Sequence, residues 1–173
     1  MTLTTDSAQS RFFKIFNDSI QIGDAVTSTV AVFKTLTVDD RLAVLWYTYT
    51  EMGRSITPAA TGTARLQLAE GLLIQIKQMP HSEQLQAIRD LAANNNTPIS
   101  SSYGVLSANT KLAFWYELSE LMVKGFVIPI PDGYKLSHDG AKILEALKLL
   151  DFGQQIIVLR KIVTDMGVDP LGD

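Results

Sequence analysis

Cysteine is absent from this chain of 173 residues, and histidine occurs only twice, at His81 and His138. Without cysteine the chain can form no disulfide and no thiolate metal site, and two distant histidines do not provide the clustered ligands that a transition metal needs. The glycine-rich nucleotide-binding motifs and the zinc-protease motif are missing as well. We therefore expect no metal site and no nucleotide-binding fold.

Charged residues and long apolar runs are also scarce. Asp, Glu, Lys and Arg make up 19% of the chain, against about 25% in an average soluble domain. The net charge of −3 lacks the basic excess of a nucleic-acid-binding protein. No apolar run approaches the roughly 18 residues of a membrane span, and the N-terminus does not resemble a secretory signal. We expect a cytoplasmic protein with no membrane span and no nucleic-acid partner.

Hydrophobic residues, in contrast, make up 46% of the chain, and the mean hydropathy is +0.13. This is more apolar side chain than a compact domain usually needs, and it excludes a disordered chain. The apolar residues recur three and four positions apart, which is helical spacing. It predicts eight helices: one that follows Asp6 or Ser7 and carries Phe12, Phe13 and Phe16, and others over residues 24–34, 38–53, 63–78, 82–94, 107–124, 137–150 and 153–165.

The ends of the predicted helices carry recognisable residues. Thr37 is an expected N-cap, with Asp39 and Asp40 in the first turn, where carboxylates suit the positive end of the helix dipole. Gly53 is an expected helix stop. The polar stretch over residues 94–102 is the best candidate for a linker, because it is rich in residues that favour turns.

The halves on either side of this stretch repeat each other at a shift of about 71 residues. Leu42-Ala43 recurs as Leu112-Ala113, Trp46-Tyr47 as Trp115-Tyr116, and Gln84-Leu85 as Gln155-Ile156. An ordered series at a near-constant shift indicates an internal duplication. We predict a single all-α domain over residues 1–173, built as two four-helix subdomains related by a pseudo-twofold axis, with a boundary near residues 94–106.

No arrangement of residues indicates catalysis. Ser137-His138-Asp139 has the residue types of a catalytic triad, but consecutive helical residues point in different directions. An N-cap at Ser137 with Asp139 in the first turn is the simpler interpretation. With no candidate acid, base or nucleophile, we expect a protein that is not an enzyme.

Aromatic residues occur at matched places in both halves. Leu42, Leu45, Trp46 and Tyr49 share one face of a predicted helix, and Phe114-Trp115-Tyr116, followed by Leu118 and Met122, turn a wide aromatic surface around another. These residues are either the core stripes of two bundles or the walls of an apolar slot between the subdomains. The polar tips of Trp and Tyr favour the slot. A helix of about 16 residues would line it for about 24 Å, which suits a long, thin, conjugated ligand.

At this point the sequence resembles a known family, the N-terminal domain of the cyanobacterial orange carotenoid protein and its stand-alone homologues, the helical carotenoid proteins. The resemblance covers residues 6–167, and its most specific stretches are Leu42-Ala43-Val44-Leu45-Trp46 with Glu51-Met52-Gly53, Leu68-Ala69-Glu70, Phe114-Trp115-Tyr116 with Glu120-Leu121-Met122, Gly125-Phe126-Val127 with Pro129-Ile130-Pro131, and Gly153-Gln154-Gln155-Ile156 with Val158-Leu159-Arg160. It implies two interleaved four-helix bundles that hold one ketocarotenoid, of the canthaxanthin or echinenone type, non-covalently between them.

The resemblance also implies site residues. The carotenoid-binding positions are Leu42, Leu45, Trp46, Tyr49, Gly62, Ile88, Trp115, Tyr116, Ser119, Met122, Ile130, Ile156 and Ile157. Ser119 stands where the family often has Gly, and Ile88 where it has Met. Arg160 matches an arginine that meets the regulatory C-terminal domain and helps to dock on the phycobilisome, although an ordinary solvated or capping arginine is an equal alternative. Asn109 lies near the same docking surface.

The implied function is photoprotection by a bound pigment that quenches singlet oxygen or excitation energy and releases it as heat. The alternatives are an excitation quencher that docks on the phycobilisome, and a carrier that delivers carotenoid to a separate homologue of the C-terminal domain. An enzyme that acts on an apolar lipid would lack a catalytic group. We expect a monomer or weak dimer in the cyanobacterial cytoplasm, at the cytoplasmic face of the thylakoids with phycobilisomes.

Overall fold

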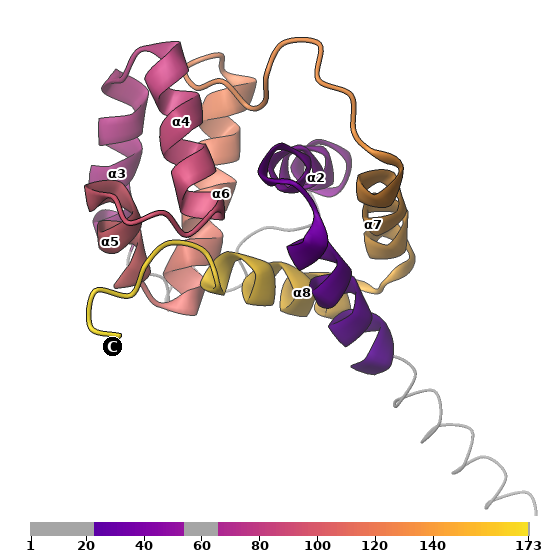
Figure 1. The fold of residues 1–173 in the computed structure, drawn as a ribbon. Helices are drawn as coiled ribbons and strands as arrows, with labels where there is room; N and C mark the ends of the chain where they lie inside the picture. Colours follow the sequence, from indigo (N-terminus) through magenta and orange to yellow (C-terminus); the bar gives the residue numbers. More distant parts are fainter. Residues whose placement is uncertain (1–22, 54–65, 173) are drawn as a thin grey trace, which may run out of the picture.

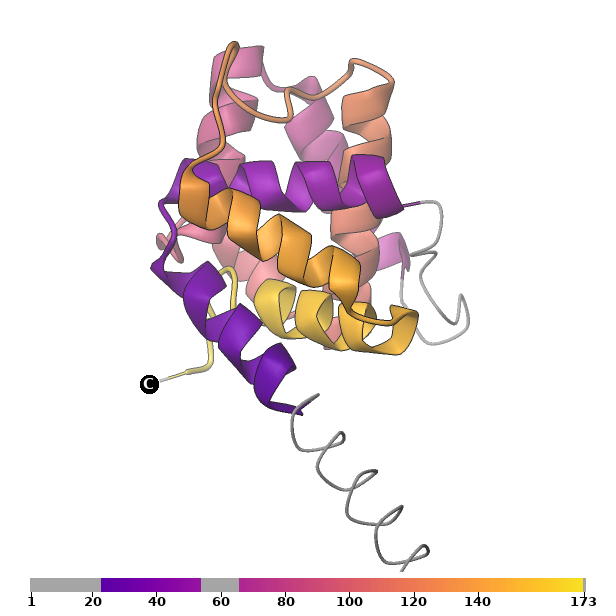
Figure 2. The ribbon, with the colours of Figure 1, turned by 90° about the vertical axis from the view of Figure 1, so that its right-hand side faces the viewer.

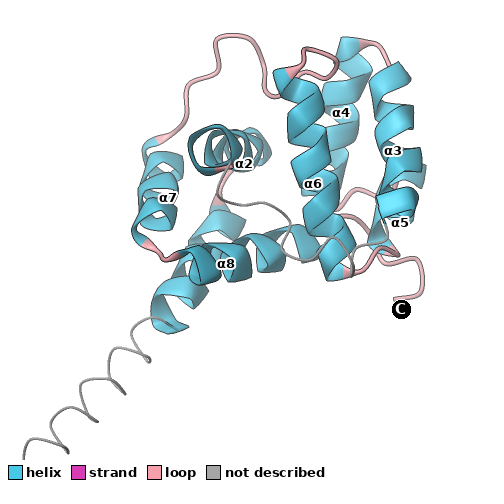
Figure 3. Ribbon diagram, turned by 180° about the vertical axis from the view of Figure 1, so that it is seen from behind, coloured by secondary structure: helices cyan, strands magenta, loops and turns pink. Residues whose placement is uncertain are grey.

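The computed structural model describes residues 23–53 and 66–172, and every regular element in these ranges is a helix (Figure 3). Residues 23–35 are helical. They are followed by α2 (Val38–Met52), α3 (Leu66–Gln78), α4 (His81–Ala92), α5 (Pro98–Gly104), α6 (Ala108–Val123), α7 (His138–Leu149) and α8 (Phe152–Thr164). The prediction of an all-α protein is confirmed, while the first predicted helix, with its three phenylalanines, lies outside the described residues.

Side-chain caps begin most of these helices at the predicted places. The hydroxyl of Thr37 accepts a hydrogen bond from the backbone N–H of Asp40, and the hydroxyl of Ser107 accepts one from Thr110, each at 3.2 Å. Ser137 caps α7 in the same way, so its interpretation as an N-cap is confirmed. Each such cap stabilises its helix by about 1 kcal/mol. At the other end of α2, Gly53 is the C-cap, as predicted.

The predicted linker is wrong in one respect, because a helix occupies most of it. Thr97 caps α5 by accepting a hydrogen bond from the backbone N–H of Ser100 at 3.1 Å, and Pro98 takes the first helical position, where its fixed φ is already helical. The Ser and Thr residues that suggested a loop instead begin a helix. The helices α4 and α5 pack on each other, so the stretch joins two neighbours.

The helices form two groups that mix the two halves of the sequence. In Figure 1, α3, α4, α5 and α6 stand on one side, and α2, α7, α8 and the helix at residues 23–35 lie on the other. Figure 2 shows α2 and α7 side by side, although they are far apart in sequence. The equivalent pair, α6 and α3, also packs together, and α6 contacts α8 as well. Each half therefore completes the packing of the other.

The helix caps define the register of the duplication. Because Thr37 and Ser107 are both N-caps, α2 and α6 correspond at a shift of 70 residues. The repeated Trp-Tyr pair, matched at a shift of 69 in the sequence, is therefore offset by one position. Trp46 corresponds to Tyr116, and Leu45 corresponds to Trp115.

Buried polar side chains follow the same duplication. Gln84 donates to the backbone oxygen of Phe126 at 2.9 Å and accepts from the N–H of Ile128 at 3.2 Å. Gln155, 71 positions later, donates to the backbone oxygen of Leu147 at 2.9 Å. Buried amides of this kind need partners, so both glutamines hold irregular chain or helix ends against the core.

Candidate functional site

An apolar slot lies between α2, α6 and α8. It encloses about 50 Å³ of free space and is lined by Leu45, Thr48, Tyr49, Gly53, Leu112, Trp115, Tyr116, Ser119, Leu159 and Val163. The residues from each helix are three or four positions apart, so one face of each helix is turned to the slot. The aromatic faces that the sequence indicated in the two halves do meet here.

Aromatic rings and one polar contact join α2 to α6 at the slot. Tyr49 stacks on Trp46 with ring centroids 6.3 Å apart and meets Tyr116 edge to face at 5.6 Å. The Tyr49 hydroxyl donates a hydrogen bond to the Glu120 carboxylate. Burial and this carboxylate raise the pKa of Tyr49 above its ordinary value, so the phenol is neutral at physiological pH.

Trp115 forms a wall of the slot, and its indole N–H points away from the slot towards α5. The side chain is buried, and its indole N–H donates to the hydroxyl of Tyr103 at 3.0 Å. Tyr103, which is fully buried on α5, donates in turn to the backbone oxygen of Val163 at 2.5 Å. Tyr103 was not predicted as a site residue, because it lies within the predicted subdomain boundary of residues 94–106, between two predicted helices.

Most of the other implied carotenoid positions are not among the residues that line the slot. Leu42, Ile88, Met122 and Ile156 are buried in the hydrophobic core, and Ile130 is half-buried against it. The side chain of Ile157 is 47% exposed on α8. Gly62 lies outside the described residues.

Polar atoms in the slot are few. The Ser119 hydroxyl donates to the backbone oxygen of Trp115 at 2.8 Å. The Thr48 hydroxyl is buried and has no hydrogen-bond partner within residues 23–53 and 66–172. A buried hydroxyl without a partner is costly, and a ligand oxygen at this place would relieve that cost. The slot is mainly apolar and aromatic, so it suits an apolar, conjugated molecule.

The free space is small for such a molecule, since pockets for organic ligands usually have about 300–1,000 Å³. A ligand must therefore separate the walls by moving side chains or by shifting α2 from α6. The Tyr49–Glu120 hydrogen bond crosses this boundary. A shift of α2 from α6 would strain it.

Arg160 lies in an open groove between the helix at residues 23–35, the start of α6 and the end of α8. The groove also contains Lys34, Lys161 and Asp165, and Lys34 forms an ion pair with Asp165 at 2.6 Å. The Nε atom of Arg160 is buried without a hydrogen-bond partner among the residues that the structure describes. Asn109, in the first turn of α6, is half-buried.

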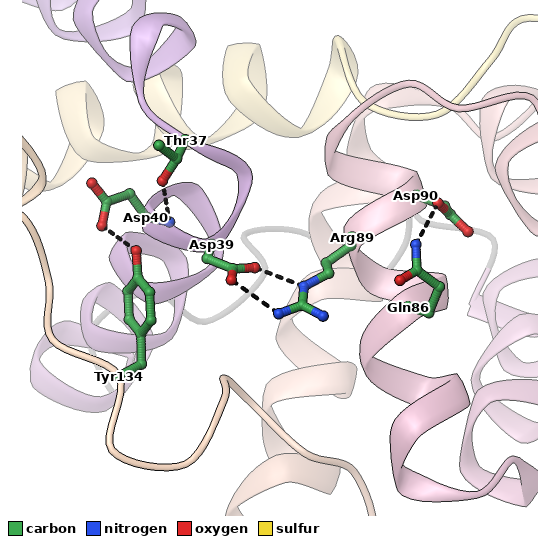
Figure 4. Close-up of polar contacts among 7 residues, drawn as sticks. All are labelled: Thr37, Asp39, Asp40, Gln86, Arg89, Asp90 and Tyr134. Atoms are coloured by element: carbon green, nitrogen blue, oxygen red, sulfur yellow. Dashed lines mark hydrogen bonds and ion pairs between the residues drawn. The ribbon is translucent and has the colours of Figure 1, made fainter.

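A second polar cluster joins α2 to α4 and to the chain between α6 and α7 (Figure 4). Arg89 donates to both carboxylate oxygens of Asp39, at 2.7 and 2.9 Å. Tyr134 donates to the buried carboxylate of Asp40 at 2.5 Å, and hydrogen bonds from Tyr134 and Ser137 lower the pKa of that carboxyl despite its desolvation. Each carboxylate has an internal partner, which explains the acidic pair structurally.

Comparisons with known proteins show which proteins this chain resembles. A family model described as the N-terminal part of the orange carotenoid protein matches residues 19–169. A Nostoc protein named as containing an orange carotenoid-binding domain is 73% identical, with both chains covered completely. The orange carotenoid-binding protein of Limnospira maxima is 47% identical over 98% of this chain and 52% of its own length, so the chain spans about half of that relative.

Solved structures show the same fold. An orange carotenoid protein of Anabaena (Nostoc), determined with canthaxanthin, matches 85% of this chain and 48% of its own, with 50% identity and a TM-score of 0.77. A red carotenoid protein of the same genus, also determined with canthaxanthin, matches 83% of this chain and 99% of its own, with 40% identity and a TM-score of 0.74. Among the described helices, none has the length and apolar character to cross a bilayer.

Proposed function

This chain belongs to the family of orange carotenoid protein N-terminal domains, and from that premise we propose that it binds one ketocarotenoid non-covalently in the slot between α2, α6 and α8. The observation that carries the proposal is the meeting of aromatic residues from both halves of the chain, Tyr49 with Trp115 and Tyr116, around an apolar slot. Flat aromatic walls stack well on conjugated ligands.

The residues of the slot fit the ring and oxygen of such a pigment. Trp115 offers its ring, because its only donor is already bonded to Tyr103. Thr48 offers a buried hydroxyl without a partner within the described ranges, which supports a keto group over a plain hydrocarbon end ring. Canthaxanthin and echinenone both have the required oxygen.

The pigment, when bound, would supply absorption of visible light and loss of excitation energy as heat. The protein holds it, orients it and keeps it from water. We propose quenching of singlet oxygen or of excited pigments as the photoprotective role, since no group in the slot is arranged for acid, base or nucleophilic chemistry. The place of action that we propose is the cyanobacterial cytoplasm, at the cytoplasmic face of the thylakoids.

Expression in a ketocarotenoid-producing host tests the proposal. We expect the pigment to co-purify with the chain and to give the protein a visible absorption band. We also expect singlet-oxygen phosphorescence to decay faster when the coloured protein is present. The pigment-free protein is the control. A soluble but colourless protein would refute carotenoid binding, whereas a coloured protein without effect on singlet oxygen would refute only the scavenging role.

The groove around Arg160 supports a second candidate function, recognition of an acidic partner surface. Lys34 already has Asp165 as its partner, whereas the half-buried Arg160 forms no ion pair within the described residues. The partners we propose are the phycobilisome, for direct quenching, and a separate homologue of the C-terminal domain, for carotenoid transfer. Loss of phycobilisome fluorescence on mixing would support the first, and movement of the visible band to the homologue would support the second. An Arg160→Gln variant should reduce the quenching of phycobilisome fluorescence or the transfer of carotenoid, whichever of the two is observed.

A further inference from the structure

Tyr103 is held in one orientation beneath the slot. Its ring packs edge to face on Phe114, with centroids 5.3 Å apart, and the Lys111 ammonium lies 5.2 Å above it. The backbone at Gly167 comes so close that an added Cβ would lie 2.6 Å from the Tyr103 ring. Neighbours on several sides therefore hold the ring in one orientation.

The hydroxyl of Tyr103 connects two walls of the slot. It accepts the indole N–H of Trp115 on α6 at 3.0 Å and donates to the backbone oxygen of Val163 on α8 at 2.5 Å. Trp115 and Val163 both line the slot. One buried hydroxyl therefore ties the indole to α8 and directs its N–H away from the slot.

The other half of the chain provides an internal comparison. At the shift of 70 residues set by the helix caps, Trp115 corresponds to Leu45 and Tyr103 corresponds to Phe33. Leu45 and Phe33 are both buried. At this position the half with an indole donor has a hydroxyl to accept it, and the half with an aliphatic side chain has a plain phenyl ring. The ring is therefore common to both halves, whereas the hydroxyl is present only where tryptophan occupies the equivalent helix position.

We infer that Tyr103 is a positioning residue for the pigment: it fixes the plane of the Trp115 indole and the spacing of α6 from α8, and through them the pose of the bound carotenoid. This inference rests on the proposed function. Without the hydroxyl, the buried Trp115 N–H loses its hydrogen-bond acceptor, and a buried donor without an acceptor is unfavourable. The indole then rotates towards a new acceptor, and the slot loses its defined wall.

The first test is made on the pigment-free protein with Tyr103→Phe, which keeps the ring. The chain has two tryptophans, so its indole N–H signals in a proton–nitrogen NMR spectrum are readily assigned with Trp46→Phe. We expect the Trp115 signal to shift and its hydrogen exchange to accelerate about tenfold, as loss of one hydrogen bond implies. An unchanged signal would overturn the inference.

The second test uses the pigment-loaded protein. We expect Tyr103→Phe to alter the visible circular dichroism of the bound carotenoid and to speed its loss, because the indole wall has moved. Tyr134→Phe is the matched control: it also removes a tyrosine hydroxyl that donates to a buried acceptor, but it lies away from the slot. It should lower stability and leave both the dichroism and the Trp115 signal unchanged.

The outcomes separate the two proposals. A colourless wild-type protein would refute carotenoid binding, whatever the NMR spectrum shows. A coloured Tyr103→Phe protein with wild-type dichroism and pigment release would overturn the positioning role even if the Trp115 signal shifts. If Tyr103→Phe fails to fold, the double variant Y103F/W115L reproduces the Phe33 and Leu45 pair of the other half; it should fold, bind pigment weakly and show altered dichroism, and wild-type dichroism in it would also overturn the role.

Discussion

The hydrogen bond from Tyr49 to Glu120 joins α2 and α6 across the slot, and its removal should speed pigment exchange. Tyr49→Phe deletes only the hydroxyl and keeps the ring contacts with Trp46 and Tyr116. The slot has about 50 Å³ of free space, so a carotenoid can enter or leave only if the walls separate. The Tyr49–Glu120 contact breaks when α2 and α6 move apart.

The size of the effect follows from the exposure of the pair. A hydrogen bond to a charged group contributes about 1.5–3 kcal/mol where it is well buried. Tyr49 and Glu120 are both half-buried, so solvent screening reduces the contribution to about 1 kcal/mol. At 25 °C this corresponds to about a fivefold faster release, because a factor of ten requires about 1.4 kcal/mol.

The assay is transfer of the bound carotenoid to liposomes in excess, followed by the visible spectrum of the protein fraction. Tyr47→Phe is the control, since Tyr47 is on the same helix but does not line the slot. We expect a release rate about fivefold faster for Tyr49→Phe, and a wild-type rate for Tyr47→Phe. Equal rates in all three proteins would refute the view that this contact holds the slot closed.

Three further predictions concern the slot, the core and pH. Thr48→Val should weaken binding of canthaxanthin but not of β-carotene in a competition experiment, because only the ketone has an oxygen for the Thr48 hydroxyl; equal losses would count against that contact. Gln84→Met should lower the free energy of unfolding by about 2 kcal/mol in urea titrations, because it leaves the backbone groups of Phe126 and Ile128 without their partner; a near-neutral change would contradict this. Burial raises the pKa of Tyr49 and Tyr103 above 10, so the unfolded chain ionises first and stability should fall as pH rises above about 10. Tyr103→Phe should reduce that fall, and an unchanged pH profile in this variant would exclude Tyr103 as a source.

The sequence predicted the helices well because their determinants are local. The caps at Thr37, Ser107 and Ser137 and the apolar spacing act within a few residues, and no distant contact overrides them. The short helix α5 was missed because its Ser and Thr residues favour turns as well as helix starts, and only packing against α4 decides between them.

The helix faces that line the slot were predictable from the sequence, but the contacts that hold those side chains in place were not. The face that carries Leu45 and Tyr49 follows from helical spacing, as does the face of Trp115 and Tyr116. The partner of the Trp115 indole does not, because it depends on which buried hydroxyl the tertiary fold brings within 3.0 Å. The exposure of Ile157 is likewise set by the packing of α8, which sequence spacing alone leaves open.

The duplication explains why the slot lies where it does. Residues that hold the fold are similar at equivalent positions: Arg41 donates to the backbone oxygen of Ala92 at 3.0 Å, and Lys111 donates to that of Thr164 at 3.0 Å. Two pairs of equivalent residues at the slot differ instead, and they differ in size in opposite directions. Where α2 has Leu45 and Tyr49, α6 has Trp115 and Ser119. A large side chain on one helix thus corresponds to a small one on the other, so two copies of one scaffold can approach closely and still leave an asymmetric slot. An asymmetric slot holds a long ligand in one direction, which a strictly repeated pair of helices could not do.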